Sequence, residues 1–243
     1  MEEYLRPMTK PFLEKILDQM NSFYIIKEIN GSYDIGFFCY IKYQNKNIPV
    51  VIINRYIKND EEYDKTIKIN IKNKSKIIKL GETRYKNLKN NVTIIEIVEN
   101  KKDNIYFTEL DDNLYKDEFE ENYYKKPIYI IQMNNIKDIS SSYGLIYNTK
   151  NSQFICSSNI KLNYNISYIF NLSNNKLIGI KGKKSKYFIY GIFLKFLING
   201  FISHYKYRSK PNKITNIKNE INILINIDKD DLDKDIYFLN FFK

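Results

Sequence analysis

The chain has 243 residues, a formal net charge of +11, and 43% hydrophobic and 15% aromatic residues. This length and apolar content suffice for one large domain or two small barrels with a packed interior, and they exclude global disorder. The single histidine excludes sites built on two histidine ligands. Two cysteines are too few for a Cys-only zinc site or a disulfide scaffold. We therefore expect no cofactor and no bound metal.

The start of the chain lacks the features of a secretory signal. Met1–Tyr4 is acidic where a signal peptide would be basic, and no apolar segment follows it. The longest apolar run, residues 188–201, is interrupted by Lys195 and Asn199 and is too short to span a bilayer. The prediction is an intracellular, cytoplasmic protein with reduced cysteines and no membrane association. A place in the virion is the alternative for a viral protein.

Positive charge is concentrated in one part of the sequence. Residues 139–219 contain 13 Lys or Arg and no carboxylate, whereas residues 1–138 contain 23 basic and 22 acidic residues. Residues 220–243 contain 3 basic and 6 acidic residues. The acid-free stretch predicts a surface for nucleic acid or an acidic protein. The competing interpretation, which we weight equally, is a chain that is rich in lysine throughout.

The first predicted element is a short amphipathic helix over Thr9–Met20. Thr9 can cap its start, and Pro11 is tolerated in a first turn. Its apolar residues recur at spacings of three and four, which is the helical period: Phe12, Ile16, Leu17 and Met20.

From residue 22 onward, short runs rich in Ile, Val, Tyr and Phe recur between polar clusters, and some alternate as Ile67 and Ile69 do. The predicted strands are Ser22–Ile29, Ile35–Tyr43, Pro49–Ile57, Thr66–Lys72, Lys76–Leu80, Val92–Val98, Ile128–Met133, Ser142–Tyr147, Gln153–Ser157, Ser167–Leu172 and Leu177–Lys181. Short strands at regular spacing without intervening helices favour a barrel or a sandwich.

A second amphipathic helix is predicted over Gly191–Tyr205, although Gly200 weakens it. Ser209–Asn212 is a candidate linker. Residues 215–243 then suggest a strand–turn–strand extension, whose apolar run Ile236–Phe242 we expect to pack on the rest of the chain or to pair with a second copy.

Three passages together resemble the motifs of trypsin-like serine peptidases, in the compact form found in microbial eukaryotes and large DNA viruses. The first passage comprises residues 36–41 (GFFCYI) and residues 48–57 (IPVVIINRYI). The second is residues 91–97 (NVTIIEI). The third runs from residues 156–158 (CSS) to residues 171–180 (NLSNNKLIGI). The likeness covers roughly residues 8–205, and the order and spacing of the passages agree with the family.

The resemblance implies an all-β fold of two antiparallel β-barrels of chymotrypsin type. An N-terminal helix, a helix after the second barrel and a short C-terminal strand pair would complete it. The expected division is a helical segment at 1–21, a first barrel at 22–125, a second barrel with its closing helix at 126–208, and a linker with a strand extension at 209–243.

The same resemblance implies that all three triad positions are substituted. The histidine position falls on Tyr56, the aspartate position on Asn91 and the serine position on Asn165. A serine nucleophile needs a base, and tyrosine, with an unperturbed pKa of about 10, does not serve as one near neutral pH. The family's loop also has glycines beside the nucleophile, where this chain has Asn163 and Ile166. We expect this loop to lack an oxyanion hole.

Other nucleophiles have weaker support. His204 reads as a helix residue, and Cys156 and Cys39 read as buried strand cysteines with no histidine to activate them. Ser157, Ser158 and Ser167 read as ordinary polar residues. The adjacent carboxylates read as loop surface rather than acid–base pairs: Glu61 and Glu62, Asp111 and Asp112, and Glu120 and Glu121.

Two basic clusters are the candidate binding residues, since lysines can grip phosphates while tyrosines stack on bases. The first contains Lys181, Lys183, Lys184 and Lys186 beside Tyr187 and Tyr190, and the second contains Lys206, Arg208, Lys210 and Lys213. The functional prediction is a catalytically inactive trypsin-like protein that acts as a binding or structural module. The alternatives are an active serine- or cysteine-type peptidase with a non-standard catalytic set and a nucleic-acid-binding protein.

Overall fold

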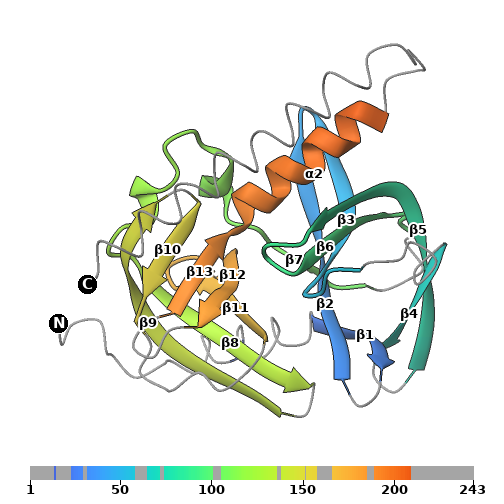
Figure 1. Ribbon diagram of the computed structural model, residues 1–243, viewed down its shortest axis with the longest axis horizontal. Coiled ribbons are helices and arrows are strands. Elements are labelled where there is room, and N and C mark those ends of the chain that lie inside the picture. Colours follow the sequence, from blue (N-terminus) through green and yellow to red (C-terminus); the bar gives the residue numbers. More distant parts are fainter. Residues whose placement is uncertain are drawn as a thin grey trace. The chain divides into compact units, whose positions relative to one another are not determined.

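The computed structural model describes Glu14 and residues 23–29, 32–57, 65–71, 74–100, 105–135, 138–150, 152–157, 166–184 and 189–208. Its strands form two groups, separated in the sequence by two short 3-10 helices (Figure 1). The first group comprises β1 (Phe23–Ile29), β2 (Ser32–Tyr43), β3 (Lys46–Ile53), β4 (Thr66–Ile71), β5 (Lys74–Asn87), β6 (Val92–Ile97) and β7 (Phe107–Thr108). The 3-10 helices are η4 (Asp112–Tyr115) and η5 (Glu121–Tyr123). The second group comprises β8 (Pro127–Asn135), β9 (Asp138–Lys150), β10 (Gln153–Cys156), β11 (Ile166–Asn171), β12 (Leu177–Lys184) and β13 (Ile189–Phe193), followed by the helix α2 (Leu194–Arg208).

The first group is a curled sheet with the strand order β1-β2-β3-β6-β5-β4, in which β7 pairs with β2. All of these pairings are antiparallel except that of β2 with β7. The sheet ends at β1 and β4, which lie near each other without a described backbone ladder between them. It is therefore a half-barrel.

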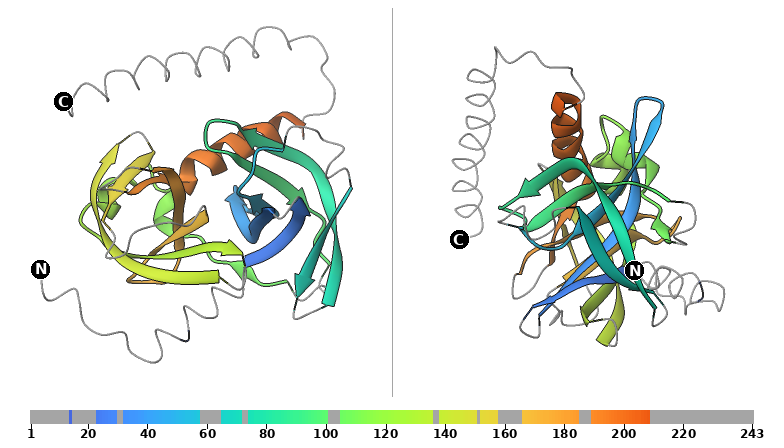
Figure 2. Two further views of the ribbon diagram at one scale, coloured as in Figure 1. Left: turned by 60° about the horizontal axis from the view of Figure 1, so that its bottom comes forward. Right: turned by 90° about the vertical axis from the view of Figure 1, so that its right-hand side faces the viewer.

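The second group is a closed barrel with the strand order β10-β13-β12-β11-β8-β9, completed by the pairing of β9 with β10. Figure 2 shows from two further sides how β8 to β13 curl around a common interior. One closed barrel and one curled half-barrel agree with an all-β, two-barrel fold class.

The half-barrel buries both faces of its central strands. Along β2, Phe37 and Cys39 belong to one hydrophobic cluster and Phe38 belongs to another, because successive side chains point to opposite faces. The cluster of Phe38 contains residues of the half-barrel alone. The cluster of Phe37 also contains the interior of the closed barrel. This two-sided burial explains why the sequence of β2 is a nearly continuous apolar run.

Aromatic rings join the two barrels. Phe23 of β1 stacks on Tyr168 of β11 with ring centroids 4.1 Å apart, and Phe37 meets the same ring edge-on at 5.3 Å. Phe170, also on β11, contacts Phe23 at 6.4 Å and stacks on Tyr129 of β8 at 4.8 Å. One face of the half-barrel thus packs directly on the outside of strand β11.

Helix α2 continues directly from β13 and contacts the half-barrel. A Cβ atom at Gly200 would lie 2.3 Å from Cζ of Tyr85 on β5, so any larger residue would force this ring to shift. The ring of His204 lies edge-on to Tyr85 at 5.4 Å, and Tyr205 meets Tyr43 of β2 at 6.1 Å. The glycine that weakens the helix in isolation is therefore the position at which α2 approaches the half-barrel.

Each predicted strand overlaps an observed strand, with differences in extent. Strand β3 ends at Ile53 rather than at residue 57, and β5 runs on to Asn87, well beyond the predicted Leu80. The predicted helix over Gly191–Tyr205 was wrong at its start: residues 191–193 belong to β13, which pairs with β10 and β12, and the helix begins at Leu194. The sequence did not predict β7 or β13 as strands.

Two predicted elements fall outside the described residues. Of the helix over Thr9–Met20, only Glu14 is described, and the extension over residues 215–243 is not described at all.

Candidate functional site

The loop that follows β3, residues 54–57, contains the first substituted triad position. The backbone N–H of Tyr56 donates a hydrogen bond to Oδ1 of Asn91, with 2.8 Å between the atoms. The structure therefore brings together two residues that are 35 positions apart and that the resemblance assigns to the histidine and aspartate positions.

Asn91 owes its position to the hairpin between β5 and β6. Its φ of 54° lies in the left-handed region, which asparagine tolerates better than most residues. Its own N–H donates to the carbonyl of Leu88 at 3.2 Å, and this closes the turn. The side chain can then accept the Tyr56 N–H from outside the turn.

Two further contacts hold the same loop. The buried hydroxyl of Thr93 on β6 donates to the carbonyl of Arg55 at 2.7 Å and accepts the N–H of Ile57 at 3.1 Å. Arg55 also forms an ion pair with Asp34 of β2, with 2.8 Å between Nη1 and Oδ2. Side chains from β2 and β6 thus fix residues 55–57.

The chemistry available at this loop is limited. Oδ1 of Asn91 accepts a backbone N–H, and the amide that carries it has no charge. Asn91 is also exposed, whereas the aspartate of a serine-peptidase triad is buried beside its histidine. A neutral amide in contact with water lacks the negative charge with which a buried aspartate stabilises a cationic histidine. Among the described side chains, no group of three His, Cys, Asp or Glu residues could hold a metal ion.

The third position, Asn165, lies outside the described residues, as do Asn163 and Ser158. The residue after Asn165 is described: Ile166 opens β11 and pairs with Met133 of β8 in extended conformation. It is not among the described residues with positive φ. Ser167 is fully buried within the same strand.

The other candidate nucleophiles are in unfavourable surroundings. Cys39 and Cys156 are both free and buried, as predicted. Burial raises the pKa of the Cys156 thiol to about 12 and raises the pKa of Cys39 as well. A thiol with such a pKa is almost entirely protonated at neutral pH, and the thiolate is the nucleophile. His204 is exposed on α2, beside Tyr85.

Sequence reasoning was wrong about Asp111. It is buried rather than a solvated loop residue, with 1% of its surface exposed. Its Oδ2 accepts hydrogen bonds from Nδ2 of Asn171 at 2.8 Å and from Nδ2 of Asn174 at 3.1 Å, and its Oδ1 accepts the N–H of Asn113 at 2.9 Å. These bonds attach the segment between the barrels to the turn between β11 and β12.

Asp112 is exposed, as predicted, but it is not isolated. It pairs with Lys42 at 2.5 Å and with Lys176 at 2.7 Å, and these hydrogen bonds hold the pKa of its carboxyl at about 2. Lys42 lies on β2 of the half-barrel, and Lys176 directly precedes β12 of the closed barrel. Of the other acidic pairs, Glu120 accepts the N–H of Ser152, and Glu61 and Glu62 lie outside the described residues.

The acid-free stretch is partly neutralised by acids from elsewhere in the sequence. Lys176 lies 3.6 Å from Glu109 in addition to its pair with Asp112. Lys195 donates to the carbonyl of Lys116 and lies over the ring of Phe119. The acidic segment around residues 109–121 therefore faces lysines that the sequence left without carboxylate neighbours.

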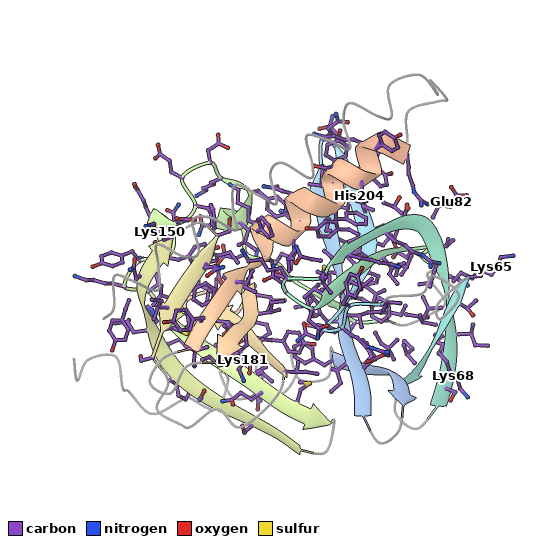
Figure 3. All side chains as sticks on the ribbon, viewed as in Figure 1. Lys65, Lys68, Glu82, Lys150, Lys181 and His204 are labelled. Carbon is purple, nitrogen blue, oxygen red and sulfur yellow. The ribbon has the colours of Figure 1, made fainter. Side chains whose placement is uncertain are left out.

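The structure describes only part of the two basic clusters. Lys181 is half-buried on β12, and Lys206 and Arg208 are exposed at the end of α2. The side chains of the remaining candidates lie outside the described parts: Lys183, Lys184, Lys186, Lys210 and Lys213. Figure 3 labels Lys181 on the closed barrel and His204 on helix α2.

Comparisons with known proteins leave the family open. No protein-family model matches the chain, and a search of curated proteins found no significantly similar sequence. Within the described part of the chain, no helix is long and apolar enough to cross a membrane.

Proposed function

We propose that this protein is a catalytically inactive relative of the trypsin-like peptidases, with a chymotrypsin-type fold, and that it acts by binding. The observation that carries this proposal is the 2.8 Å hydrogen bond from the Tyr56 N–H to Asn91 Oδ1. It supports the assignment of both residues to one site. Neither side chain is a general base at neutral pH, and a hydroxyl nucleophile needs such a base nearby.

The alternative of a cysteine-type peptidase has less support. Cys156 is fully buried on β10, and Cys39 is fully buried on β2. Reactive cysteines lie in partly exposed, electropositive surroundings that lower the pKa, whereas burial raises the pKa of both thiols here.

Covalent probes test the proposal directly. We expect neither a fluorophosphonate nor a chloromethylketone to label the native protein, with an active trypsin-like enzyme as the positive control. Labelling of any residue, located by peptide mass spectrometry, would overturn the proposal and would identify the nucleophile.

Restoring the triad provides a second test. We expect the variant Tyr56→His, Asn91→Asp, Asn165→Ser to show no turnover of casein or of small ester substrates. An oxyanion hole needs backbone N–H groups that converge on one oxygen, and the extended conformation of Ile166 in β11 is unsuited to a tight turn at that residue. Losing one such donor reduces the rate by about 100- to 1,000-fold.

The single variant Asn91→Asp is the matched folding control for this experiment. Aspartate also tolerates a positive φ, and its carboxylate can accept the Tyr56 N–H. Clear turnover by the triple variant, absent from the parent and from Asn91→Asp, would show that the oxyanion hole is intact.

Nucleic-acid binding remains a second candidate because residues 139–219 contain no carboxylate. It has weaker support, since Lys176 pairs with carboxylates from outside that stretch. Phosphate contacts predict steep salt dependence, so retention on heparin or DNA at about 50 mM salt should be largely lost by about 200 mM. Retention that does not weaken over this range would count against nucleic-acid binding.

A further inference from the structure

The closed barrel contains a row of polar side chains across three neighbouring strands. Ser167 of β11 lies opposite Gln132 of β8, and Gln132 lies opposite Ser140 of β9. Directly opposed residues of antiparallel strands point to the same face of the sheet. Ser142, two residues along β9, shares this face, and its Oγ accepts a hydrogen bond from Nε2 of Gln132 at 3.1 Å.

This row is shielded from solvent. Gln132 and Ser167 are 0% exposed, and Ser140 is half-buried with its Oγ shielded. Ser142, in the next row, is also 0% exposed. In the adjacent row on the same face, Ser142 lies opposite Ile130, and Ile130 lies opposite Ile169. Both isoleucines are fully buried, and neither side chain can form a hydrogen bond. The polar row is therefore bordered by hydrocarbon on that side.

Three polar atoms of the row have no hydrogen-bond partner among the residues that the structure describes. They are Oε1 of Gln132, Oγ of Ser140 and Oγ of Ser167. Buried polar groups in folded proteins are nearly always hydrogen-bonded, to protein or to ordered water. Three unsatisfied polar atoms on directly opposed residues are unusual, and each of them needs a hydrogen-bond partner.

We propose that the closed barrel binds an internal water molecule between Gln132 and its two opposed serines. Water can donate to Oε1 of Gln132 and both donate to and accept from hydroxyl groups, so it matches the chemistry of all three atoms. Buried water molecules typically form about three hydrogen bonds to groups that would otherwise be unsatisfied. The site does not depend on the loss of catalysis.

A rotated Gln132 amide is the competing explanation. If Oε1 and Nε2 exchanged places, Oε1 could accept a hydrogen bond from the Ser142 hydroxyl, and Nε2 could donate to one of the other serines. That arrangement still leaves one of the two opposed serines without a side-chain partner, since Ser140 and Ser167 lie on opposite sides of Gln132.

A high-resolution crystal structure of the intact chain tests the site. We expect an electron-density peak about 2.6–3.2 Å from Oε1 of Gln132 and from the hydroxyl oxygens of both Ser140 and Ser167. A well-resolved map without this peak would overturn the proposal, whether or not protein groups satisfy the three atoms. This outcome leaves the proposed function unaffected, because covalent probes test that separately.

Oxygen-17 relaxation dispersion counts long-lived internal water molecules in solution. The variant Gln132→Met, Ser140→Ala, Ser167→Ala should contain at least one fewer than the parent, because it removes every proposed partner. The control Ser203→Ala alters an exposed hydroxyl on α2 and should leave the number unchanged. Equal numbers in the parent and the triple variant would overturn the proposal. If the triple variant does not fold, the parent crystal structure decides.

Discussion

The half-barrel and the closed barrel hold their strands together in different ways. Every strand of the closed barrel pairs with two neighbours, so no edge remains. The half-barrel ends at β1 and β4 and instead buries both faces of β2, one of them against Tyr168 of the other barrel. Apolar packing thus substitutes for the backbone pairs that the half-barrel lacks.

This difference makes the two barrels unequal in their dependence on each other. A closed sheet satisfies its backbone hydrogen bonds internally, whereas an open sheet relies on the element that covers its exposed face. We therefore expect the half-barrel to need the closed barrel more than the reverse. Four variants test this expectation and the contacts between the barrels.

The largest effect should come from Phe37→Ala. Phe37 is fully buried and contacts both Phe23 and Tyr168, so truncation should lower the free energy of unfolding by about 3–5 kcal/mol. Urea denaturation measures the loss. The exposed Tyr147→Ala, on β9, is the control and should change stability by less than about 0.5 kcal/mol.

Hydrogen exchange on the same variant sharpens the comparison. Amides of β1–β6 should exchange faster in Phe37→Ala, while those of β8–β13 keep most of their protection. Equal loss of protection in both groups would show that the barrels unfold as one unit and that the expected inequality is wrong.

Thr93→Val should lower the free energy of unfolding by about 1–3 kcal/mol, because it removes the hydroxyl that bonds both Arg55 and Ile57 while keeping the side-chain shape. The half-barrel holds the 54–57 loop with side chains, and this variant measures that support. Thr66→Val, at an exposed position of β4, is the matched control. A loss of stability as small as that of Thr66→Val would show that the loop does not depend on Thr93.

Gly200→Ala should lower the free energy of unfolding by about 1–2 kcal/mol despite the higher helix propensity of alanine, because its Cβ would overlap the Tyr85 ring. A double-mutant cycle with Tyr85→Ala isolates the contact. The alanine at residue 200 should be tolerated, or even stabilising, once the ring is removed. Purely additive effects would mean that α2 does not pack on β5 through this glycine.

Asp112→Asn should have the smallest effect, at most about 1 kcal/mol, because exposed ion pairs contribute little. The folded pKa of about 2 lies below the ordinary value of 3.8, so the stabilisation is present above pH 4 and is lost as the pH falls towards 2. The parent should therefore lose more stability than the variant between pH 5 and pH 2. Parallel pH profiles would show that Lys42 and Lys176 do not stabilise the carboxylate.

Local sequence patterns predicted the strands well, because apolar residues at every second position mark the buried face of a strand. Ile67 and Ile69 are 2% and 0% exposed, as their spacing indicated. The predicted start of α2 was wrong because the apolar sequence of residues 191–193 is compatible with both a helix and a strand. They form a strand because they pair with β12 and with β10, whose Phe154 is 37 residues from its partner Gly191.

The site was predictable only in part, for the same reason. The motifs pointed to Tyr56 and Asn91, and the structure brings these residues together. The burial of Asp111 left no local signal, because its partners Asn171 and Asn174 are 60 and 63 residues away. Its charged neighbours in the sequence suggested a solvated loop. Asp111 is buried instead, because it bonds to Asn171 and Asn174 much further along the chain.

The contact of Phe23 and Phe37 with β11 also matters while the chain is being synthesised. During synthesis, the half-barrel is complete when Thr108 has emerged, but Phe170, which covers one of its faces, follows 62 residues later. At ribosomal rates of about 5–20 residues per second, this interval is roughly 3–12 s. A nascent chain therefore presents an uncovered aromatic sheet face for seconds, during which a chaperone that binds apolar surface would have its substrate.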